Sequence, residues 1–184
     1  MTFEQAITVD APPEAVFALT QDYARRLTWD PFLRSAELVG GATAAGVGVR
    51  AYCVARWGVG METEYVTFRA PAVAAVRMTR GPWVLARFAG SWRFRAVAPG
   101  RTRVTFRYQV RGRPRWLAPV FDPVLGAVFR WETGRRLRAL QAAVRRERAA
   151  TCAVGVHLSV TPHAQPAMTE RSAVPESLPR SQDK

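Results

Sequence analysis

Apolar and polar residues alternate along most of the first 110 positions, a pattern that predicts β-strands. Five segments between glycine- or proline-rich turns are expected to form strands: residues 3–9, 35–39, 47–55, 61–69 and 73–78. The clearest alternation lies in residues 84–95 and 103–110, which Pro99 and Gly100 separate. Aromatic and aliphatic residues occupy one face of both segments and arginines the other. We therefore expect a long antiparallel hairpin with an apolar inner face and a basic outer face.

Helical patterns are expected in three places. Two short helices are predicted over residues 10–20 and 22–28, because prolines and an acid suit a first turn and Pro31 stops the second helix. A long amphipathic helix is predicted from Asp122, a good N-cap residue, to about Arg148. Its apolar stripe consists of Val124, Ala127, Val128, Trp131, Leu137, Leu140 and Val144.

Residues 150–184 differ from the rest of the chain in composition. They carry four prolines and many Ser, Thr and Gln residues, with no sustained periodicity. Such a segment cannot bury enough apolar surface to offset the entropy cost of ordering. We therefore expect one domain over residues 1–149, followed by a disordered tail over residues 150–184.

The chain has a formal net charge of +13, and all but one of its 27 basic residues are arginine. Residues 66–149 hold 19 of the arginines and only 3 acidic residues, whereas residues 1–65 are net acidic. Such an asymmetry is typical of a surface that binds nucleic acid or anionic lipid. It is also typical of a solvent-exposed face that is rich in arginine because the gene comes from a GC-rich genome. The excess of arginine therefore leaves both interpretations open.

The two cysteines, Cys53 and Cys152, lie far apart and form no CxxC pair, so we expect free thiols in a reducing compartment. The first residues show no basic region followed by an apolar run, as a signal peptide would. No stretch reaches the about 18 apolar residues of a membrane span. These observations together predict a cytoplasmic protein.

The order of these elements resembles the START-like superfamily, also called SRPBCC, and within it the polyketide cyclase/dehydrase group. The resemblance covers about residues 3–148 and rests on Ile7–Phe17, Trp29–Phe32, the glycine-bearing strand near Gly46–Arg50 and the long helix. It implies an α+β helix-grip fold, in which a curved antiparallel sheet surrounds the long C-terminal helix. It also implies a deep cavity between them for a small hydrophobic or aromatic, lipid- or polyketide-like ligand.

Inward aromatic side chains are the candidates to line this cavity. We expect Trp92, Phe94, Phe106 and Tyr108 from the hairpin, and Phe121, Leu125 and Phe129 from the long helix. Each of these residues could instead be ordinary core. Arg77 could orient a ligand oxygen, or it could form an ion pair with Glu62 or Glu64, which share a strand face. An inward glutamate pair would be an acid/base couple, whereas an outward pair would be solvated carboxylates.

The predicted domain contains no histidine, since His157 and His163 both lie in the tail. The motifs of hydrolases, zinc enzymes and nucleotide-binding enzymes are absent, so no metal and no cofactor are expected. The remaining acid/base candidates are Asp22, Asp30, Glu37, Glu62, Glu64, Glu132 and the tyrosines Tyr23, Tyr52, Tyr65 and Tyr108. A cyclase needs little beyond positioning and a proton donor, so enzymatic activity stays open.

One surface segment combines cations with an aromatic residue. Arg111, Arg113, Arg115 and Trp116 lie just before the long helix and suit an anionic membrane surface. The same segment could be an ordinary loop with Trp116 folded inward. Three functions therefore follow from the sequence: a binder of hydrophobic small molecules, a polyketide cyclase/dehydratase, and an anionic-surface binder. The first predicts a closed apolar cavity, the second predicts titratable groups converging inside it, and nucleic acid is the least favoured partner.

Overall fold

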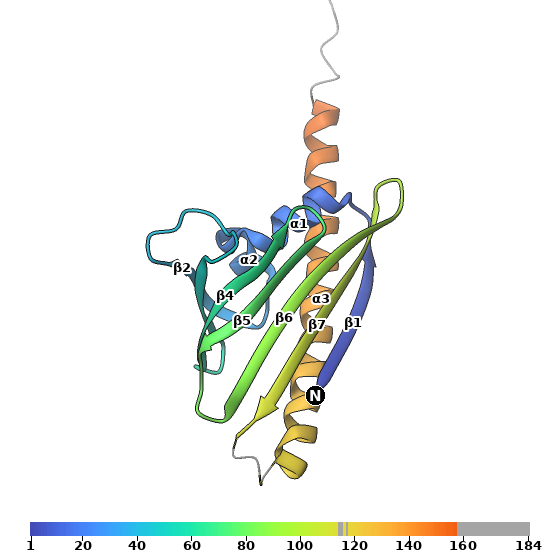
Figure 1. The fold of residues 1–184 in the computed structure, drawn as a ribbon. Helices are drawn as coiled ribbons and strands as arrows, with labels where there is room; N and C mark the ends of the chain where they lie inside the picture. Colours follow the sequence, from blue (N-terminus) through green and yellow to red (C-terminus); the bar gives the residue numbers. More distant parts are fainter. Residues whose placement is uncertain (114–115, 117, 158–184) are drawn as a thin grey trace, which may run out of the picture.

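Seven antiparallel strands form one curved sheet, and a long C-terminal helix lies against its inner face (Figure 1). The computed structural model describes residues 1–113, 116 and 118–157. In chain order the elements are β1 (Thr2–Val9), α1 (Pro13–Gln21), α2 (Tyr23–Trp29), β2 (Leu33–Val39), β3 (Arg50–Ala55), β4 (Gly60–Arg69), β5 (Val73–Arg80), β6 (Leu85–Ala98), β7 (Arg101–Gly112) and α3 (Ala118–His157). This is the helix-grip architecture that the sequence pattern predicts.

The first strand closes the sheet beside the last one. The strand order is β1-β7-β6-β5-β4-β3-β2, so β1 and β2 form the two edges although they follow each other in the chain. Helices α1 and α2 make this crossover. Phe3 pairs with Tyr108 and Val9 with Thr102, which places β1 and β7 directly over α3. The enclosed side chains form the core, which includes Val9, Val16, Leu19, Tyr65, Trp92, Val104, Leu137 and Leu140.

The β6–β7 hairpin has the two faces that its alternation predicts. Trp92 pairs with Phe106 across the strands, and both side chains are buried. On the outer face Arg95 lies opposite Arg103, and Arg87 lies opposite Arg111. Directly opposed like charges destabilise a sheet, so the arginine face is a cost to the fold.

Helix α3 is longer than predicted at both ends. It begins at Ala118 instead of Asp122, so Pro123 lies inside the helix and Asp122 is not its N-cap. It ends at His157 instead of Arg148. The predicted domain limit at residue 149 therefore falls within this helix. Residues 158–184 of the predicted tail lie outside the described residues.

The apolar stripe predicted for α3 mixes two faces of the helix. Val124, Ala127 and Trp131 are exposed. The buried face instead consists of Gly126, Thr133, Arg136, Leu137, Leu140, Ala143 and Val144. The buried face follows the helical period of 3.6 residues but includes two polar residues, Thr133 and Arg136. A search for apolar residues alone did not identify them.

A register shift between Tyr65 and Thr67 changes which side chains of β4 face inward. Tyr65 and Phe68 both point into the core, where their rings lie 5.5 Å apart. Glu62 and Glu64 both lie on the outer face of the sheet, as one of the two expectations had it, but Glu62 is only 9% exposed and is not the solvated carboxylate expected there. Glu62 lies 3.2 Å from Arg50, and a hydrogen bond from Thr79 is the main cause that lowers its pKa.

Candidate functional site

A small cavity lies between the inner face of the sheet, α2 and α3. Its volume is about 70 Å³, well below the about 300–1,000 Å³ of pockets that enclose a drug-sized ligand. The lining residues are Gln21, Tyr23, Arg26, Phe32, Leu33, Cys53, Met61, Thr63, Tyr65, Val76, Phe88, Gly90, Trp92, Phe106 and Arg136. Several of these side chains are polar and can form hydrogen bonds, so the cavity is not the purely apolar one expected of a passive hydrophobic carrier.

Two arginines share one buried carboxylate beside this cavity. Asp30 lies at the C-cap of α2, one helical turn beyond Arg26, and their side chains meet at 3.1 Å. Arg136 reaches Asp30 from the buried face of α3, with its Nε 3.0 Å from Oδ2 and 3.1 Å from Oδ1. The Phe32 backbone N–H donates to Oδ1 at 3.0 Å. We call Arg26, Asp30 and Arg136 the arginine–aspartate triad.

The triad carries a net charge of +1, because two guanidiniums face one carboxylate. Burial alone would raise the pKa of Asp30, but Arg136 and Arg26 hold it below its ordinary value. Burial lowers the pKa of Arg136, and Asp30 opposes this. Burial also acts against the charge on Arg26, yet Asp30 leads the effects that raise its pKa. All three groups are therefore charged at neutral pH, and one positive charge has no partner within the triad.

Aromatic rings surround the two guanidiniums. Arg26 lies 5.7 Å from the centre of the Trp92 ring, and Arg136 lies 4.6 Å from Phe32 and 5.5 Å from Phe106. Ring faces attract cations, so these contacts help to retain the charge in a water-poor place. The predicted liners Trp92 and Phe106 thus form the aromatic walls of a cationic site.

A chain of hydrogen bonds runs along the other side of the cavity. The Tyr65 hydroxyl donates to Oε1 of Gln21 at 3.0 Å, and the hydroxyls of Tyr23 and Tyr65 lie 3.0 Å apart. Since Tyr65 has a single hydroxyl hydrogen, Tyr23 donates to Tyr65. Burial raises the pKa of both phenols, so they are neutral at physiological pH. They are neutral hydrogen-bond donors, not bases.

Cys53 completes the cavity wall between these two groups. Burial raises the pKa of its thiol, which keeps it protonated and weakly nucleophilic. Of the ionisable groups around the cavity, Asp30 is held by two arginines and Cys53 keeps its proton. The cavity therefore stabilises negative charge and donates hydrogen bonds, while a free base is lacking among its described residues.

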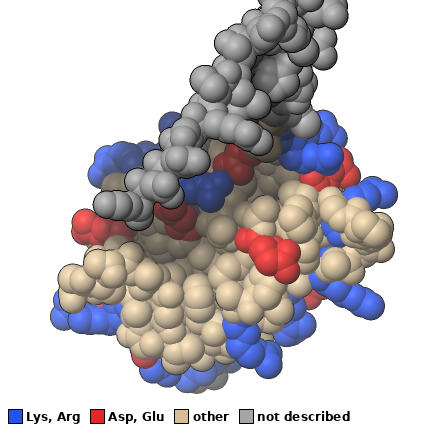
Figure 2. Space-filling model, turned by 90° about the horizontal axis from the view of Figure 1, so that it is seen from above, with Lys and Arg blue, Asp and Glu red and all other residues tan. Residues whose placement is uncertain are grey.

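A larger open groove adjoins the small cavity. It has a volume of about 660 Å³ and lies between α1, α2 and the loop that leads into β3. Its lining is mainly apolar: Phe17, Ala18, Gln21, Asp22, Tyr23, Ala24, Arg25, Leu38, Ala42, Thr43, Ala44, Ala45 and Phe68. The surface is hollowed at this end of the molecule (Figure 2). Gln21 and Tyr23 line both spaces, so these two side chains divide the groove from the triad.

Four of the other predicted liners, Phe94, Tyr108, Leu125 and Phe129, do not line this cavity. Phe94 packs against Phe17 with ring centres 5.4 Å apart, and Tyr108 packs at the same distance against Phe129. Leu125 is partly buried against the core. The side chain of Phe121 lies outside the described residues.

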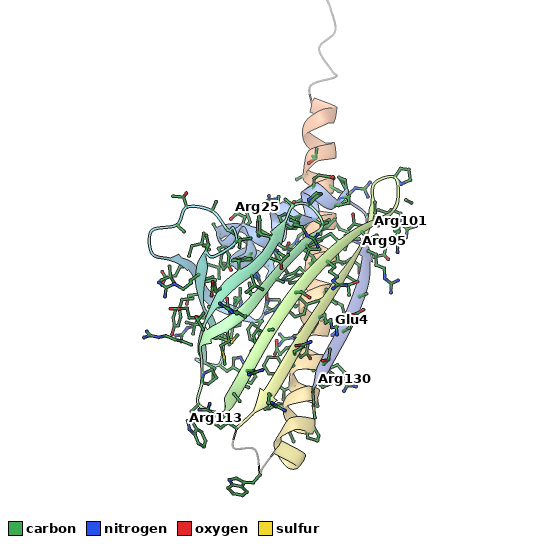
Figure 3. The ribbon with its side chains drawn as sticks, in the orientation of Figure 1. Glu4, Arg25, Arg95, Arg101, Arg113 and Arg130 are labelled. Carbon is green, nitrogen blue, oxygen red and sulfur yellow. The ribbon has the colours of Figure 1, made fainter. Side chains whose placement is uncertain are left out.

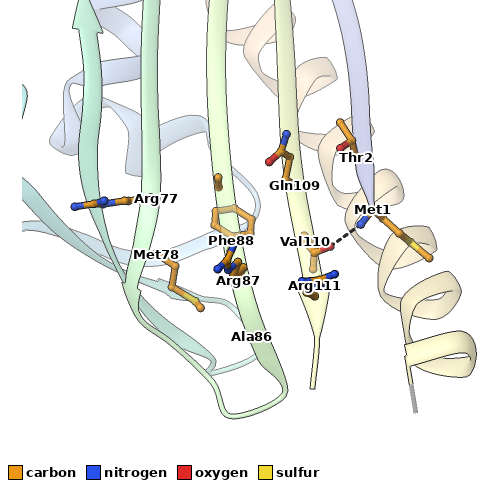
Figure 4. A pocket seen from close by; sticks show the side chains of 11 residues that line it. Met1, Thr2, Arg77, Met78, Ala86, Arg87, Phe88, Gln109, Val110 and Arg111 are labelled. Carbon is orange, nitrogen blue, oxygen red and sulfur yellow. Dashed lines mark hydrogen bonds between the residues drawn. The ribbon is translucent and has the colours of Figure 1, made fainter. Parts of the chain in front are cut away.

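Arg77 lies on the outer face of the sheet, so it cannot orient a ligand in the cavity. Its guanidinium is 3.0 Å from Glu64 and its side chain is 63% exposed. The alternative expectation, an ion pair with one of the glutamates, is the arrangement found. Arg77 instead lines a shallow outer groove of about 660 Å³ together with Arg87 and Arg111 (Figure 4).

The remaining acid/base candidates have structural roles or lie at the surface. The Asp22 side chain caps α2 by accepting from the Arg25 N–H at 3.1 Å. Glu132 pairs with Arg135 at 3.3 Å, and Glu37 is exposed on β2. Among the described residues, no cluster of three or more His, Cys, Asp and Glu side chains is arranged to hold a metal ion.

The sequence reasoning missed Arg26 and Arg136. Arg136 lies on the same buried face of α3 as Thr133, Leu137 and Leu140. A charged residue at such a position indicates a buried ion pair. Arg26 and Asp30 have the spacing of an i,i+4 pair.

Comparison with known families agrees with this architecture. A family model described as polyketide cyclase / dehydrase and lipid transport matches residues 1–145. The chain belongs to this family. No protein with a curated description matches the sequence.

Solved structures of family-like proteins share the fold at low sequence identity. The Zhui aromatase/cyclase from Streptomcyes sp. R1128 is 21% identical with a TM-score of 0.67, covering 82% of this chain and 97% of its own. A START superfamily protein from Mycobacterium smegmatis is 11% identical with a TM-score of 0.65, covering 79% and 97%. Ara h 8.0201 is 19% identical with a TM-score of 0.62, covering 79% and 98%. These likenesses place the family member in the START and Bet v 1-like helix-grip fold.

The segment predicted to meet a membrane lies partly within the described residues. Arg111, Arg113 and Trp116 are exposed, and Arg115 lies outside the described residues. Trp116 does not fold inward. None of the helices in the described ranges is long and apolar enough to cross a bilayer. The comparisons name no membrane partner, so that interpretation stays a prediction.

Proposed function

We propose that the protein binds a small molecule with a planar apolar body and an anionic or enolisable oxygen, as in a polyketide. The observation that carries this proposal is the net positive arginine–aspartate triad, buried beside the two hydrogen-bonded tyrosines. The family description, which includes polyketide cyclases and dehydrases, points to the same class of ligand.

The charge of the triad selects the chemistry of the ligand. A buried cation without a partner is costly, and an enolate, phenolate or carboxylate would neutralise it. Guanidiniums also donate several hydrogen bonds in a plane, which suits carbonyl and carboxylate oxygens. A plain hydrocarbon chain would gain nothing from Arg26 and Arg136. A β-dicarbonyl compound therefore fits better than a saturated lipid.

The size of the two spaces defines how such a ligand would bind. The cavity of about 70 Å³ has room for a carbonyl group but not for a ring system. The groove of about 660 Å³ has room for the apolar body. A rotation of Tyr23 would join the two spaces, so that the body lies in the groove and the oxygen meets the triad.

A second function, cyclase or dehydratase activity, is favoured by the convergence of titratable groups at the cavity. The two arginines would stabilise the negative charge that develops on an enolate oxygen. Tyr23 and Tyr65 keep their protons, so their hydroxyls could donate hydrogen bonds to a leaving hydroxyl or to an enolate oxygen. The walls would hold a flexible chain in one folded conformation.

The test compares a matched pair of probes by isothermal titration calorimetry. Benzoylacetone carries a phenyl ring and a β-diketone, whereas butylbenzene has the ring and chain without oxygen. The R26M variant leaves Asp30 paired with Arg136, so it removes the excess charge and keeps the pair. We expect R26M to weaken benzoylacetone binding at least 10-fold and to leave butylbenzene unchanged.

The matched control for this test is R77M, which removes an arginine from the outer face. R77M is expected to bind both probes as the unmodified protein does, and thermal unfolding checks that each variant is folded. Equal affinity of the unmodified protein for both probes would contradict the proposal, as would a folded R26M variant that retains full affinity for benzoylacetone.

A further inference from the structure

Exposed tryptophans gather at one end of the molecule. Because the strands are antiparallel, the β3–β4 turn, the β5–β6 turn and the end of β7 lie at the same end of the strands, where β1 begins (Figure 1). Each of these segments presents one tryptophan: Trp57 is 58%, Trp83 68% and Trp116 77% exposed. We call this end of the sheet the tryptophan end; it consists of Met1 and residues 56–59, 80–84, 111–113 and 116.

These three exposures are not the usual state of tryptophan in this protein. Trp29 and Trp92 are buried in the core. Trp131 is exposed on α3, where Arg135 lies 4.7 Å from its ring centre. The tryptophan end adds the exposed side chains of Met1, Val59 and Val84 to its three indoles. A concentration of large apolar side chains in water indicates a surface that meets an apolar partner.

Cations lie among these apolar side chains. Arg56, Arg80, Arg111 and Arg113 are all exposed, and Arg113 is seen at this end in Figure 3. Arg56, Arg111 and Arg113 form no ion pair with another described residue. No acidic residue occurs in residues 56–59, 80–84 or 111–113. The partner is therefore expected to be negatively charged as well as apolar.

We propose that the tryptophan end docks on an anionic lipid bilayer. Indole rings favour the boundary between headgroups and acyl chains, and arginines pair with the phosphates just above it. The residues project from the tips of separate turns, which suits shallow insertion. A nucleic acid would give the exposed Met1, Val59 and Val84 no favourable contact. Since no described helix can cross a membrane, the association is peripheral.

The first experiment is sedimentation of the full chain with vesicles, read by bound protein and by tryptophan emission. We expect binding to vesicles of phosphatidylcholine with 30% phosphatidylglycerol (about one lipid in three), with a blue shift of emission. Binding to pure phosphatidylcholine should be at least 10-fold weaker, and salt should weaken binding because it screens the arginines.

A triple variant, W57A/W83A/W116A, is expected to lose at least 10-fold in affinity for the anionic vesicles. The matched control is W131A, which removes an equally exposed tryptophan (59%) from α3 and should bind normally. All four side chains are exposed, so folding should persist, and circular dichroism checks it. The triple variant keeps the arginine–aspartate triad, so it should still bind benzoylacetone. The vesicle experiment therefore tests the tryptophan end separately from the interior site.

Three outcomes would overturn the proposal. The first is an unmodified protein that does not bind anionic vesicles. The second is a W131A variant that loses as much affinity as the triple variant. The third is a loss of self-association in the triple variant, seen by light scattering, which would make this end an interface between two copies of the chain.

Discussion

Asp30 is the residue on which the geometry of the interior depends. Its carboxylate is fully buried, accepts hydrogen bonds from Arg26 and Arg136, and accepts the Phe32 N–H as well. It therefore ties α2 to α3 across 106 residues of chain. The same contacts hold the guanidiniums where a ligand oxygen would meet them, so stability and binding share one residue.

Replacing Asp30 with asparagine is expected to destabilise the protein by about 3–5 kcal/mol, because two buried guanidiniums lose their counter-charge. Urea unfolding at pH 7 measures this loss. The control is D22N, which keeps a good N-cap on α2 and should change stability by less than about 0.5 kcal/mol. A D30N variant no less stable than D22N would contradict the role of the triad.

The pH dependence of stability follows from the lowered pKa of Asp30. Because the folded value lies below the unfolded value of about 3.9, the contribution is complete above that pH and is lost as the pH falls through the folded value. We expect the unmodified protein to lose stability in this acid range more steeply than D30N. Urea unfolding from pH 6 to about pH 2.5 tests this, and parallel curves for the two proteins would refute it.

At the scale of elements, the β6–β7 hairpin provides the aromatic wall of the cavity and also a strained outer face. Its inner face aligns Trp92 with Phe106, while its outer face sets Arg95 against Arg103. The first pairing stabilises the hairpin and the second weakens it. The apolar contacts on the inner face of the hairpin must therefore offset the repulsion between the arginines on its outer face.

Reversing one charge of such a pair should stabilise the hairpin. R103E would place a glutamate opposite Arg95, and we expect a gain of about 0.2–1 kcal/mol, measured as a higher Tm. R93E serves as the control, because Thr105 lies directly opposite and no directly opposed pair of arginines is relieved there. Equal gains from both variants would assign the effect to net charge instead of to the cross-strand pair.

At the scale of the whole molecule, the net charge of +13 means that the positively charged side chains repel one another and so destabilise the folded state. At 0.1 M salt, interactions between exposed charges that lie more than a Debye length of about 10 Å apart are largely screened, whereas the buried triad is little affected. Raising sodium chloride from 10 mM to about 0.1 M should therefore raise the Tm of the unmodified protein. A Tm that falls with added salt would show that favourable surface pairs outweigh the repulsion.

Most of the fold could be predicted because its signals are local. The alternation in β6 and β7 and the turn at Pro99 and Gly100 each lie within a few residues, and the family resemblance supplied the packing of helix on sheet. The length of α3 was underestimated because Asp122 and Pro123 resemble a helix start, although the helix begins at Ala118.

The candidate site was harder to predict because it depends on long-range contacts. The triad joins residues from α2 and α3, and the hydrogen bond between Tyr23 and Tyr65 joins α2 to β4. Aromatic content indicated Trp92 and Phe106, which line the small cavity, but could not distinguish cavity walls from core such as Phe94. Polar residues were judged as isolated acids and bases, so the pairing of Arg136 with Asp30 was not foreseen.

The pairing of β1 with β7 also affects how the chain can assemble during synthesis. Strands β2 to β7 can form successive hairpins as they leave the ribosome, but Thr2–Val9 has no partner until Arg101–Gly112 has emerged. The inner face then still lacks α3, which follows β7 in the chain. A nascent chain therefore exposes its aromatic wall until α3 has emerged, and chaperone contact should be concentrated in that interval.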